Sequence, residues 1–534
     1  MVSACTENAG ADPPSDASTI RRHAVRKKRI AGLGLCLTTM LAAPAMAQTA
    51  TATATNVAPQ RDAFYWLGEI NKASLVINTR QGLLDAKLAP HIAKGLDTVL
   101  SAGDQPGGAR PDLVITFEPL LIKAAGVEAT LLHAGRSSQD MLATVRAAMY
   151  RDRLLVLAAQ LRTTTATLRR LAQQYEATIV PNYTNGVAAQ PNSYGHYLLG
   201  HVAGLQRDAQ RLHELYARVD LSPMGTTVLN GTSWPLDRDR MAHALGFADK
   251  VDNAYDAAQI AATDLPVEIG ALATSIALHT SAFVQDVMVQ YAQPRPWILL
   301  REGGGNTYVS SAMPQKRNPG LLNDTRTAAS MVVTLGVGRA ITAHNIPPGM
   351  SDVKHIDENM AVMDRTTALL KRWDRVLNAL VIDPQRALDE LDSDWTAAQE
   401  IADVLMREHG LPFRVGHHFA SEIVDYAKAH DLRPSQFPYA EAQRIFKQTL
   451  TEMNVSGGEL PMTESQFRAT LDPVAIVMHR ATSGGPQPAE MKRMLARTDR
   501  ELDADGKWID THRQTIDQSL ASLDKDFSKY LPTN

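Results

Sequence analysis

Residues 310–319 read Ser310-Ser311-Ala312-Met313-Pro314-Gln315-Lys316-Arg317-Asn318-Pro319. The two prolines restrict the backbone torsion φ, so we expect a rigid turn within a polar loop. Gly303-Gly304-Gly305 comes just before this segment and supplies a flexible stem on which the loop can close. A hydroxyl, a cation and an amide lie close together in such a loop, which predicts the lid of an enzyme site.

These residue types suit the removal of a proton from a carbon next to a carboxylate. That step builds negative charge on the carboxylate, so it requires a base, a cation and oriented amide donors. Ser310, Lys316 and Asn318 are the candidates for these roles. A Ser-Ser pair beside Lys-Arg is also common in ordinary solvated loops, so the residue types alone leave that interpretation open.

The bulk properties favour an enzyme that acts on small molecules. The 534 residues suggest about three domains at ~150 residues each. A composition with 44% hydrophobic and 21% charged residues is typical of a soluble protein. The net charge of -3 offers no basic surface, which argues against nucleic acid as a main partner.

Residues 1–47 have the pattern of a signal peptide. Arginines and lysines within 21–29 precede an apolar run over 30–43, which ends at Ala45-Met46-Ala47. This small-x-small triplet predicts cleavage after Ala47. The apolar run is short for a membrane span, although an uncleaved anchor remains the alternative. We therefore expect an exported protein, periplasmic or secreted, with no membrane contact after cleavage.

The mature chain differs in chemistry from its leader. Cys5 and Cys36 both lie in the leader, so the mature chain has no thiol for a disulfide, a metal or a nucleophile. Loss of the leader's six basic and three acidic residues leaves 48 basic and 54 acidic residues, a net charge of -6. Residues 48–60 are rich in Thr and Ala and are expected to form a flexible stem.

The remaining sequence predicts a mostly α fold. Apolar residues recur at helical spacing from Met141 to Leu168 and again from Leu198 to Tyr216. Residues 325–343 are apolar on nearly every side, which favours a helix buried inside a bundle or against other subunits. Alternation of the kind expected for strands is scarce.

A break near Asp383-Pro384 suggests the domain organisation. Shorter helices and proline-containing loops follow this point. We predict an N-terminal helical domain over 61–139, a central helical-bundle domain over 140–383 and a C-terminal helical domain over 384–534.

Residues 309–319 resemble the Gly-Ser-Ser-x-Met-Pro-x-Lys-x-Asn-Pro signature of the fumarase, aspartase and argininosuccinate lyase superfamily, with Val309 in place of glycine. Four more stretches resemble argininosuccinate lyase in particular: His133–Asp140, Pro181–Pro191, Gly231–Phe247 and Gly410–His417. They follow that family's order from about Asp62 to the C-terminus. The resemblance implies a mostly α three-domain fold, a homotetramer with a central helical core, and active sites each built from three chains.

The resemblance also implies roles for individual residues. It makes Ser310 the base, with Lys316 and Asn318 holding the substrate. Positions that contact the substrate in the family correspond to Ser137, Gln139, Thr184, Asn185, Gln190, Ser311, Met313, Asn323 and His355. A helix N-cap explains Ser137 equally well. No cofactor and no metal are implied.

Several substitutions depart from the family pattern. Asn185 replaces the family's histidine, and Asn323 replaces the glutamate that orients it. Amides do not exchange protons near neutral pH, so this pair can position a substrate but cannot protonate a leaving group. Glu358 stands where the family has lysine, which reverses a charge and predicts rejection of argininosuccinate. His355 replaces a glutamine and is either a displaced proton donor or an ordinary surface histidine.

The resemblance implies cleavage of a carbon-nitrogen bond in an N-substituted aspartate, with release of fumarate. Export argues against a role in arginine biosynthesis, whose intermediate is cytoplasmic. Two alternatives remain open: a superfamily lyase with another leaving group, and a non-catalytic descendant retained for binding or structure. His417 and His418 are adjacent and so face different directions on a helix, which does not predict a zinc pair.

Overall fold

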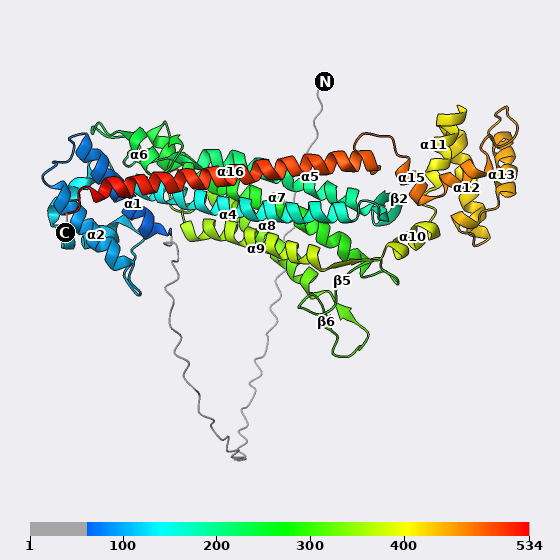
Figure 1. Ribbon diagram of the computed structural model, residues 1–534, viewed down its shortest axis with the longest axis horizontal. Helices are drawn as coiled ribbons and strands as arrows, with labels where there is room; N and C mark the ends of the chain where they lie inside the picture. Colours follow the sequence, from blue (N-terminus) through cyan, green and yellow to red (C-terminus); the bar gives the residue numbers. More distant parts are fainter. Residues whose placement is uncertain (1–60, 533–534) are drawn as a thin grey trace, which may run out of the picture. The chain divides into compact units, whose positions relative to one another are not determined.

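The computed structural model describes residues 61–532. The predicted signal peptide and stem lie outside these residues. Figure 1 shows that the described chain is mostly helical, as the apolar periodicity predicts.

The N-terminal part packs three helices and one 3-10 turn: α1 (Ala63–Arg80), α2 (Ala89–Gly103), α3 (Val114–Ala125) and η1 (Val127–His133). Asp62 caps α1, because its carboxylate accepts a hydrogen bond from the Tyr65 amide at 3.0 Å. Helix α1 is buried on most sides because it packs against α2, α4 and α16.

The central part is a bundle of long helices, with one short helix beside it: α4 (Ser138–Gln174), α5 (Tyr194–Val219), α6 (Arg238–Ala244), α7 (Ala261–Gln290), α8 (Gly320–Ala343) and α9 (Ile356–Ala379). Helix α4 packs on α5 and α9, and α7 packs on α8. The two apolar stripes read from the sequence lie in α4 and α5, so both helix predictions are confirmed.

Helix α7 continues from a π-helical turn, η2 (Asp256–Ile260). The combined helix Asp256–Gln290 is long and apolar enough to cross a membrane by length and composition alone. Its extensive packing against α8 and α5 is that of a core helix in a bundle.

Helix α8 covers the segment predicted to be apolar on nearly every side. Leu322 and Val332 are buried within the single chain, whereas Met331 and Ile341 are 54% and 71% exposed. One side of this helix therefore has no cover from the described part of its own chain.

Four small two-stranded sheets connect the helices: β1 (Ile179–Thr184) with β2 (Val187–Ser193), β3 (Leu221–Ser222) with β4 (Asp249–Lys250), β5 (Ile298–Leu300) with β8 (Leu380–Ile382), and β6 (Tyr308–Val309) with β7 (Arg317–Asn318). The β3–β4 pair is parallel and the other three are antiparallel. The β1–β2 and β6–β7 pairs carry most of the residues predicted for the site.

The C-terminal part has a hydrophobic cluster of its own, running from Trp395 to Leu471. Its elements are α10 (Pro384–Ser393), α11 (Ala398–His409), α12 (Phe413–Ala429), η3 (Pro434–Gln436), α13 (Tyr439–Glu452), α14 (Glu464–Thr470) and α15 (Pro473–Met478). The predicted break coincides with the start of α10, where the Asp383 carboxylate accepts a hydrogen bond from the Arg386 amide.

The last helix, α16 (Pro488–Ser528), returns to the bundle and packs on α1, α4 and α5. Most of its buried side chains, from Met491 to Phe527, belong to the main hydrophobic core. The predicted C-terminal range of 384–534 therefore supplies residues to both clusters, and its domain boundaries stay a prediction.

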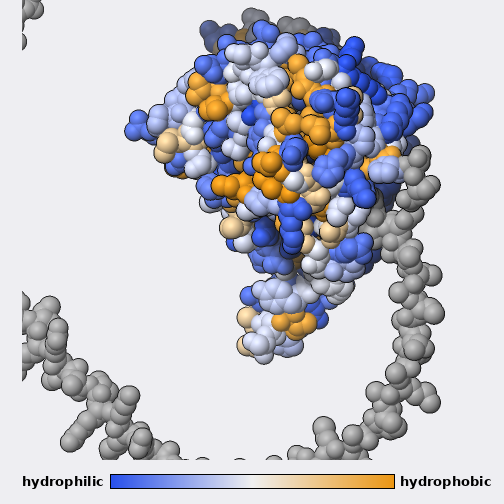
Figure 2. All heavy atoms as spheres, turned by 90° about the vertical axis from the view of Figure 1, so that its left-hand side faces the viewer, coloured by the Kyte–Doolittle hydropathy of each residue, from blue (hydrophilic) through white to orange (hydrophobic). Residues whose placement is uncertain are grey.

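Figure 2 views the end of the molecule at which α1 and α2 lie. Apolar side chains form small separate groups on this face, with polar side chains between them. Ile115 of α3 and Val127 of η1 are among the most exposed apolar residues of the chain, at 76% and 66%.

Candidate active site

The lid segment forms the hairpin β6–β7. The Ser310 amide donates to the Lys316 carbonyl at 3.3 Å and closes the loop. The Ser310 Oγ accepts hydrogen bonds from the amides of Met313 at 3.2 Å and Ala312 at 3.4 Å. Two N–H dipoles therefore point at the hydroxyl oxygen, which favours its deprotonated form.

Lys316 is exposed and has no ion pair or side-chain hydrogen bond within residues 61–532. Its neighbour Arg317 is held in place, because its Nε donates to Glu302 Oε2 at 2.9 Å. Asn318 Nδ2 donates to the Tyr308 carbonyl across the hairpin at 3.4 Å. One cation of this loop is thus fixed and the other is available for a substrate.

The predicted glycine stem has an unusual backbone. Gly303, Gly304 and Gly305 all have positive φ, between 59° and 77°. Three successive residues in this region demand glycine, because a Cβ atom disfavours such torsions. Ser311 and Met313, also predicted to contact substrate, are exposed beyond this stem.

Ser137 is the N-cap of α4. Its side chain accepts a hydrogen bond from the Gln139 amide at 3.0 Å, and Asp140 completes a capping box by accepting from the Ser137 amide at 2.7 Å. The N-cap interpretation of Ser137 is therefore confirmed. Burial raises the pKa of Asp140 to about 6, against the opposing pull of three backbone amides that donate to it.

Asn185 lies with Gly186 in the two-residue turn of the β1–β2 hairpin. Their φ values of 53° and 79° are those of a type I′ turn, for which Asn-Gly is the favoured pair. Thr184 ends β1 beside this turn and is exposed. The turn geometry is a sufficient reason for asparagine at this position, and sequence reasoning missed it.

The other predicted contact residues lie on separate elements. Asn323 is in the first turn of α8, and His355 is the exposed N-cap residue of α9. Gln190 of β2 donates to Gln399 Oε1 of α11 at 2.7 Å. No hydrogen bond joins Asn185 to Asn323 within the range that the structure describes.

The reversed charge at Glu358 has a partner. Arg339 Nη1 lies 2.8 Å from Glu358 Oε2, and the same nitrogen donates to the Asn359 amide oxygen at 3.2 Å. Glu358 is therefore matched by a nearly buried cation from α8. The negative charge of Glu358 is therefore partly neutralised within the chain, in the absence of a ligand.

Two cations near this pair were missed by the sequence analysis. Burial lowers the pKa of Arg146 on α4, and burial together with the nearby Arg146 charge lowers the pKa of Lys354. Neither forms an ion pair with a carboxylate in the described chain, and Lys354 contacts Gln259 Oε1 at 3.4 Å. Two unneutralised cations that repel each other suit an anionic ligand. Their proximity comes from tertiary packing, so no local motif signals it.

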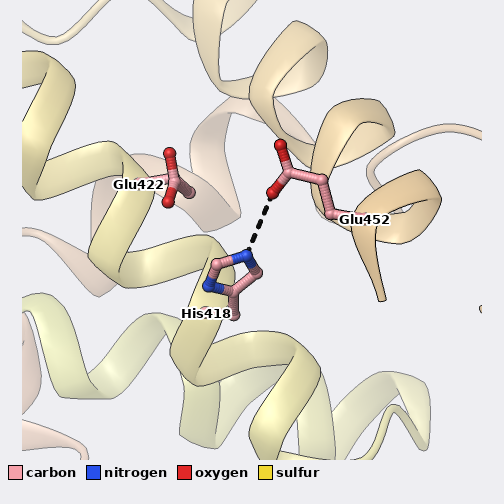
Figure 3. Close-up of side chains that lie close together, drawn as sticks. All are labelled: His418, Glu422 and Glu452. Carbon is pink, nitrogen blue, oxygen red and sulfur yellow. Dashed lines mark hydrogen bonds and ion pairs between the residues drawn. The ribbon is translucent and has the colours of Figure 1, made fainter. Parts of the chain in front are cut away.

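Figure 3 shows one histidine and two glutamates close together in the C-terminal part. His418 and Glu422 are four residues apart on α12, and Glu452 ends α13. One potential ligand atom from each lies within 4.8 Å of the others, and His418 Nε2 is 3.1 Å from Glu452 Oε2. The sequence does not predict this group, because Glu452 comes from a different helix than His418 and Glu422. An exposed ion pair accounts for its geometry.

The structure thus brings Ser310, Lys316 and Asn318 together on one hairpin. It leaves the β1–β2 turn elsewhere on the bundle, as Figure 1 shows. No hydrogen bond or ion pair connects the two hairpins among residues 61–532.

Comparison with known proteins identifies the family. The sequence profile of the lyase family matches residues 120–334, and that of the argininosuccinate lyase C-terminal region matches residues 395–478. The chain belongs to this lyase family. The family predicted from the lid and the four further stretches is confirmed.

Relatives of this lyase are similar over most of their length. Argininosuccinate lyase of Methanosarcina acetivorans is 27% identical over 462 residues, which cover 85% of this chain and 90% of the relative. Argininosuccinate lyase of Methanoculleus marisnigri is 29% identical over 475 residues, covering 86% and 93%.

Solved structures show the same fold. EDDS lyase in complex with formate has a TM-score of 0.77 at 24% identity, over 88% of this lyase and 92% of that chain. Fumarate lyase from Mesorhizobium has a TM-score of 0.62 at 15% identity, over 82% and 96%. The predicted fumarase/aspartase-type fold is therefore confirmed for the single chain.

Proposed function

We propose that this lyase cleaves the carbon-nitrogen bond of an N-substituted aspartate and releases fumarate. Ser310 removes a proton from Cβ, the electron pair forms the Cα–Cβ double bond, and the amine departs with the bonding electrons of the C–N bond. Lys316 and Asn318 hold the carboxylate on which negative charge builds. No redox step is involved, so the reaction balances without a co-reactant.

The observation that carries this proposal is the environment of Ser310 Oγ. A serine hydroxyl is a weak base until its deprotonated form is stabilised. Here two backbone amides donate to the oxygen, and the unpaired Lys316 lies in the same ten-residue loop. Both features favour a negative charge at this oxygen.

We propose that the working enzyme is a homotetramer whose sites combine residues of several chains. Met331 and Ile341 of α8 and Leu278 of α7 are large apolar side chains that are more than half exposed in one chain. Such residues on long bundle helices are typical of an interface between subunits. Packing of these helices against another copy would also bring a second chain's residues to the lid.

The substrate is proposed to be an aspartate adduct other than argininosuccinate. Asn185 and Asn323 cannot deliver a proton to the departing amine, so we assign that role to His355, whose imidazole is a proton-exchanging group exposed at the start of α9. A variant of EDDS lyase, whose fold this chain shares, has been solved with bound fumarate, which supports fumarate as the common product. Lys354 and Arg146 are candidates to hold the second carboxylate.

The test is to follow fumarate by ultraviolet absorbance while the mature protein is incubated with argininosuccinate and a panel of N-substituted aspartates. We expect release from at least one adduct, with Ser310→Ala reducing the rate at least 100-fold. Ser528→Ala at the exposed end of α16 is the matched control and is expected to keep the wild-type rate. Activity that survives in Ser310→Ala contradicts the assignment of the base.

The second candidate is a non-catalytic descendant retained for binding or structure. It is favoured by the loss of both proton-exchanging groups at Asn185 and Asn323, and by the turn role of Asn185. It predicts that no adduct releases fumarate and that binding of fumarate is unchanged in Ser310→Ala. The other enzymatic alternative, a superfamily lyase with a different leaving group, predicts no fumarate from the N-substituted aspartates and fumarate release from a succinate with a non-amine leaving group tested beside them.

We also propose that the protein is exported and cleaved after Ala47, because the leader has a basic segment, an apolar run and a small-x-small triplet. N-terminal sequencing of the exported protein is expected to begin at Gln48. Recovery of the uncleaved chain in the cytoplasm would contradict export.

A further inference from the structure

A cavity of about 360 Å³ lies between the β1–β2 hairpin, the first turn of α5 and the last turns of α7. Pockets for small molecules typically occupy about 300–1,000 Å³, so this one has room for a compact ligand. Among the predicted site residues, Asn185 alone lines it. The lid residues take no part in its walls.

The walls are mainly aromatic and aliphatic. The Tyr194 ring stacks on Tyr197 with centroids 5.5 Å apart, and it meets Trp297 edge-on at 5.7 Å. Val180, Val287, Val289 and Ile298 add aliphatic side chains to the lining. Such walls favour a flat or hydrocarbon body over a highly hydrated one.

Two buried polar atoms of the lining have no partner. The Tyr194 hydroxyl and Gln290 Oε1 form no hydrogen bond within the described chain, although their residues are only 2% and 1% exposed. An unmade hydrogen bond of this kind costs about 1–3 kcal/mol.

The orientation of Gln290 is fixed by a network on its other side. Gln290 Nε2 donates to the Tyr183 hydroxyl at 2.8 Å, and Trp297 Nε1 donates to the same oxygen at 2.9 Å. Tyr183 in turn donates to Glu390. The amide oxygen of Gln290 is left as a free acceptor.

Among the residues that the structure describes, Asp286 is the only charged side chain that lines the cavity, and it is exposed. It lies one helical turn before Gln290 on α7, so the two side chains share a face of the helix. The Tyr197 hydroxyl donates to Asp286 Oδ2 at 2.7 Å and fixes the carboxylate. No arginine or lysine lines the cavity, so a dicarboxylate such as fumarate finds no cation there.

We propose that this cavity is a binding site for a small organic cation, a primary ammonium carried on an aromatic or short apolar body. The ammonium donates to the Asp286 carboxylate, and the body packs on Tyr194 and Trp297. Tyrosine faces add a cation–π attraction. This site is separate from the lid, and the proposal does not depend on the elimination reaction.

Titration calorimetry of the mature protein with phenethylamine tests the proposal without any turnover. Two probes of similar shape serve as controls, 2-phenylethanol without charge and 3-phenylpropanoate with the opposite charge. We expect phenethylamine to bind at least tenfold more tightly than either. Equal binding of the alcohol, or no detectable binding of the amine, overturns the proposal.

Variants locate the site. Asp286→Asn removes the charge and keeps an oxygen for the Tyr197 hydroxyl, so it is expected to weaken phenethylamine binding at least tenfold. Val289→Phe fills the cavity and is expected to abolish binding, whereas Asp264→Asn, an exposed change on the same helix, leaves it unaltered. Circular dichroism checks that each variant is folded. Wild-type affinity in both folded cavity variants places the ligand elsewhere and overturns the proposal.

Discussion

Asn185 both adopts the positive φ of a tight turn and takes the place of a side chain that can exchange a proton. Its φ of 53° and that of Gly186, 79°, belong to a tight hairpin turn that asparagine and glycine tolerate best. The resemblance places histidine here, whereas Asn-Gly is the pair that this type of turn favours. The replacement therefore secures the hairpin while it removes a proton-exchanging group.

We predict that Gly186→Ala destabilises the protein by about 1 kcal/mol, because alanine resists positive φ. Gly458→Ala is the matched control: an added Cβ meets open space at both positions, but only Gly186 has positive φ. The control is expected to be neutral or slightly stabilising. Thermal unfolding measures both changes, and equal midpoints for the two variants would refute the turn assignment.

Glu69 makes stability depend on pH. Burial raises the pKa of its carboxyl from the ordinary 4.5 to about 7, and the ion pair with Lys72 at 2.8 Å only partly opposes this. The folded state therefore holds the proton more tightly than the unfolded state between these values. Stability contributed by this group is present below pH 4.5 and is lost as the pH rises towards 7.

Replacing Glu69 with glutamine should remove that loss. The variant is expected to gain stability relative to wild type as the pH rises from 4.5 to 7, up to about 3 kcal/mol. Glu214→Gln at an exposed position of α5 is the control and should show no such trend. Unfolding midpoints at pH 5, 6, 7 and 8 decide the matter, and a Glu69→Gln gain that does not change with pH would be inconsistent with this account.

Sequence reasoning located the lid residues because they lie within ten positions of one another and share one hairpin. It could not find Arg146 beside Lys354, since they come from α4 and from the segment before α9. Nor could it find Glu452 beside His418, which are 34 positions apart. These contacts depend on how the helices pack against one another, and no local sequence pattern predicts that packing.

At the scale of elements, the crossing of α7 and α8 depends on two glycines. A Cβ atom on Gly270 would lie 2.4 Å from the Gly336 carbonyl oxygen, and one on Gly336 would lie 2.5 Å from that of Gly270. Both distances are far inside van der Waals contact. The two backbones can approach this closely only because neither residue has a side chain.

We predict that Gly270→Ala costs about 1–3 kcal/mol, because the helices must separate to admit the methyl group. Gly200→Ala on α5 is the control, since a Cβ there meets nothing within 4 Å and alanine favours the helix. The thermal midpoint should fall for Gly270→Ala and hold or rise for Gly200→Ala. A fall of equal size in both would show that the crossing is not critical.

The long helices were predictable and the short strands were not. Helices α4 and α5 contain many apolar repeats, so the period of 3.6 is unmistakable. Strands β1 and β2 have six and seven residues, and their burial runs in blocks instead of alternating. The signal that would have found this hairpin is the Asn-Gly pair at its centre.

At the scale of the whole molecule, α16 joins the end of the chain to its beginning. Lys72 of α1 pairs with Asp524 at 2.6 Å, and Arg162 Nε of α4 donates to the Leu502 carbonyl at 2.8 Å. These partners are 340 or more positions apart, so no local sequence pattern predicts that they are in contact. The sequence predicts the break at Asp383-Pro384, but it does not predict that the last helix packs back on the central bundle.

We propose that the lid serine acts only where another chain completes the site. The decisive measurement is fumarate release by mixed oligomers, prepared by dissociating Ser310→Ala and Thr184→Val proteins together and letting them reassociate. Each variant alone should be inactive. In a 1:1 mixture, random assortment leaves about a quarter of the sites with both wild-type residues, so we predict about a quarter of the wild-type activity. Wild-type protein treated in the same way should recover fully, and a mixture that stays inactive beside that control would contradict the shared site.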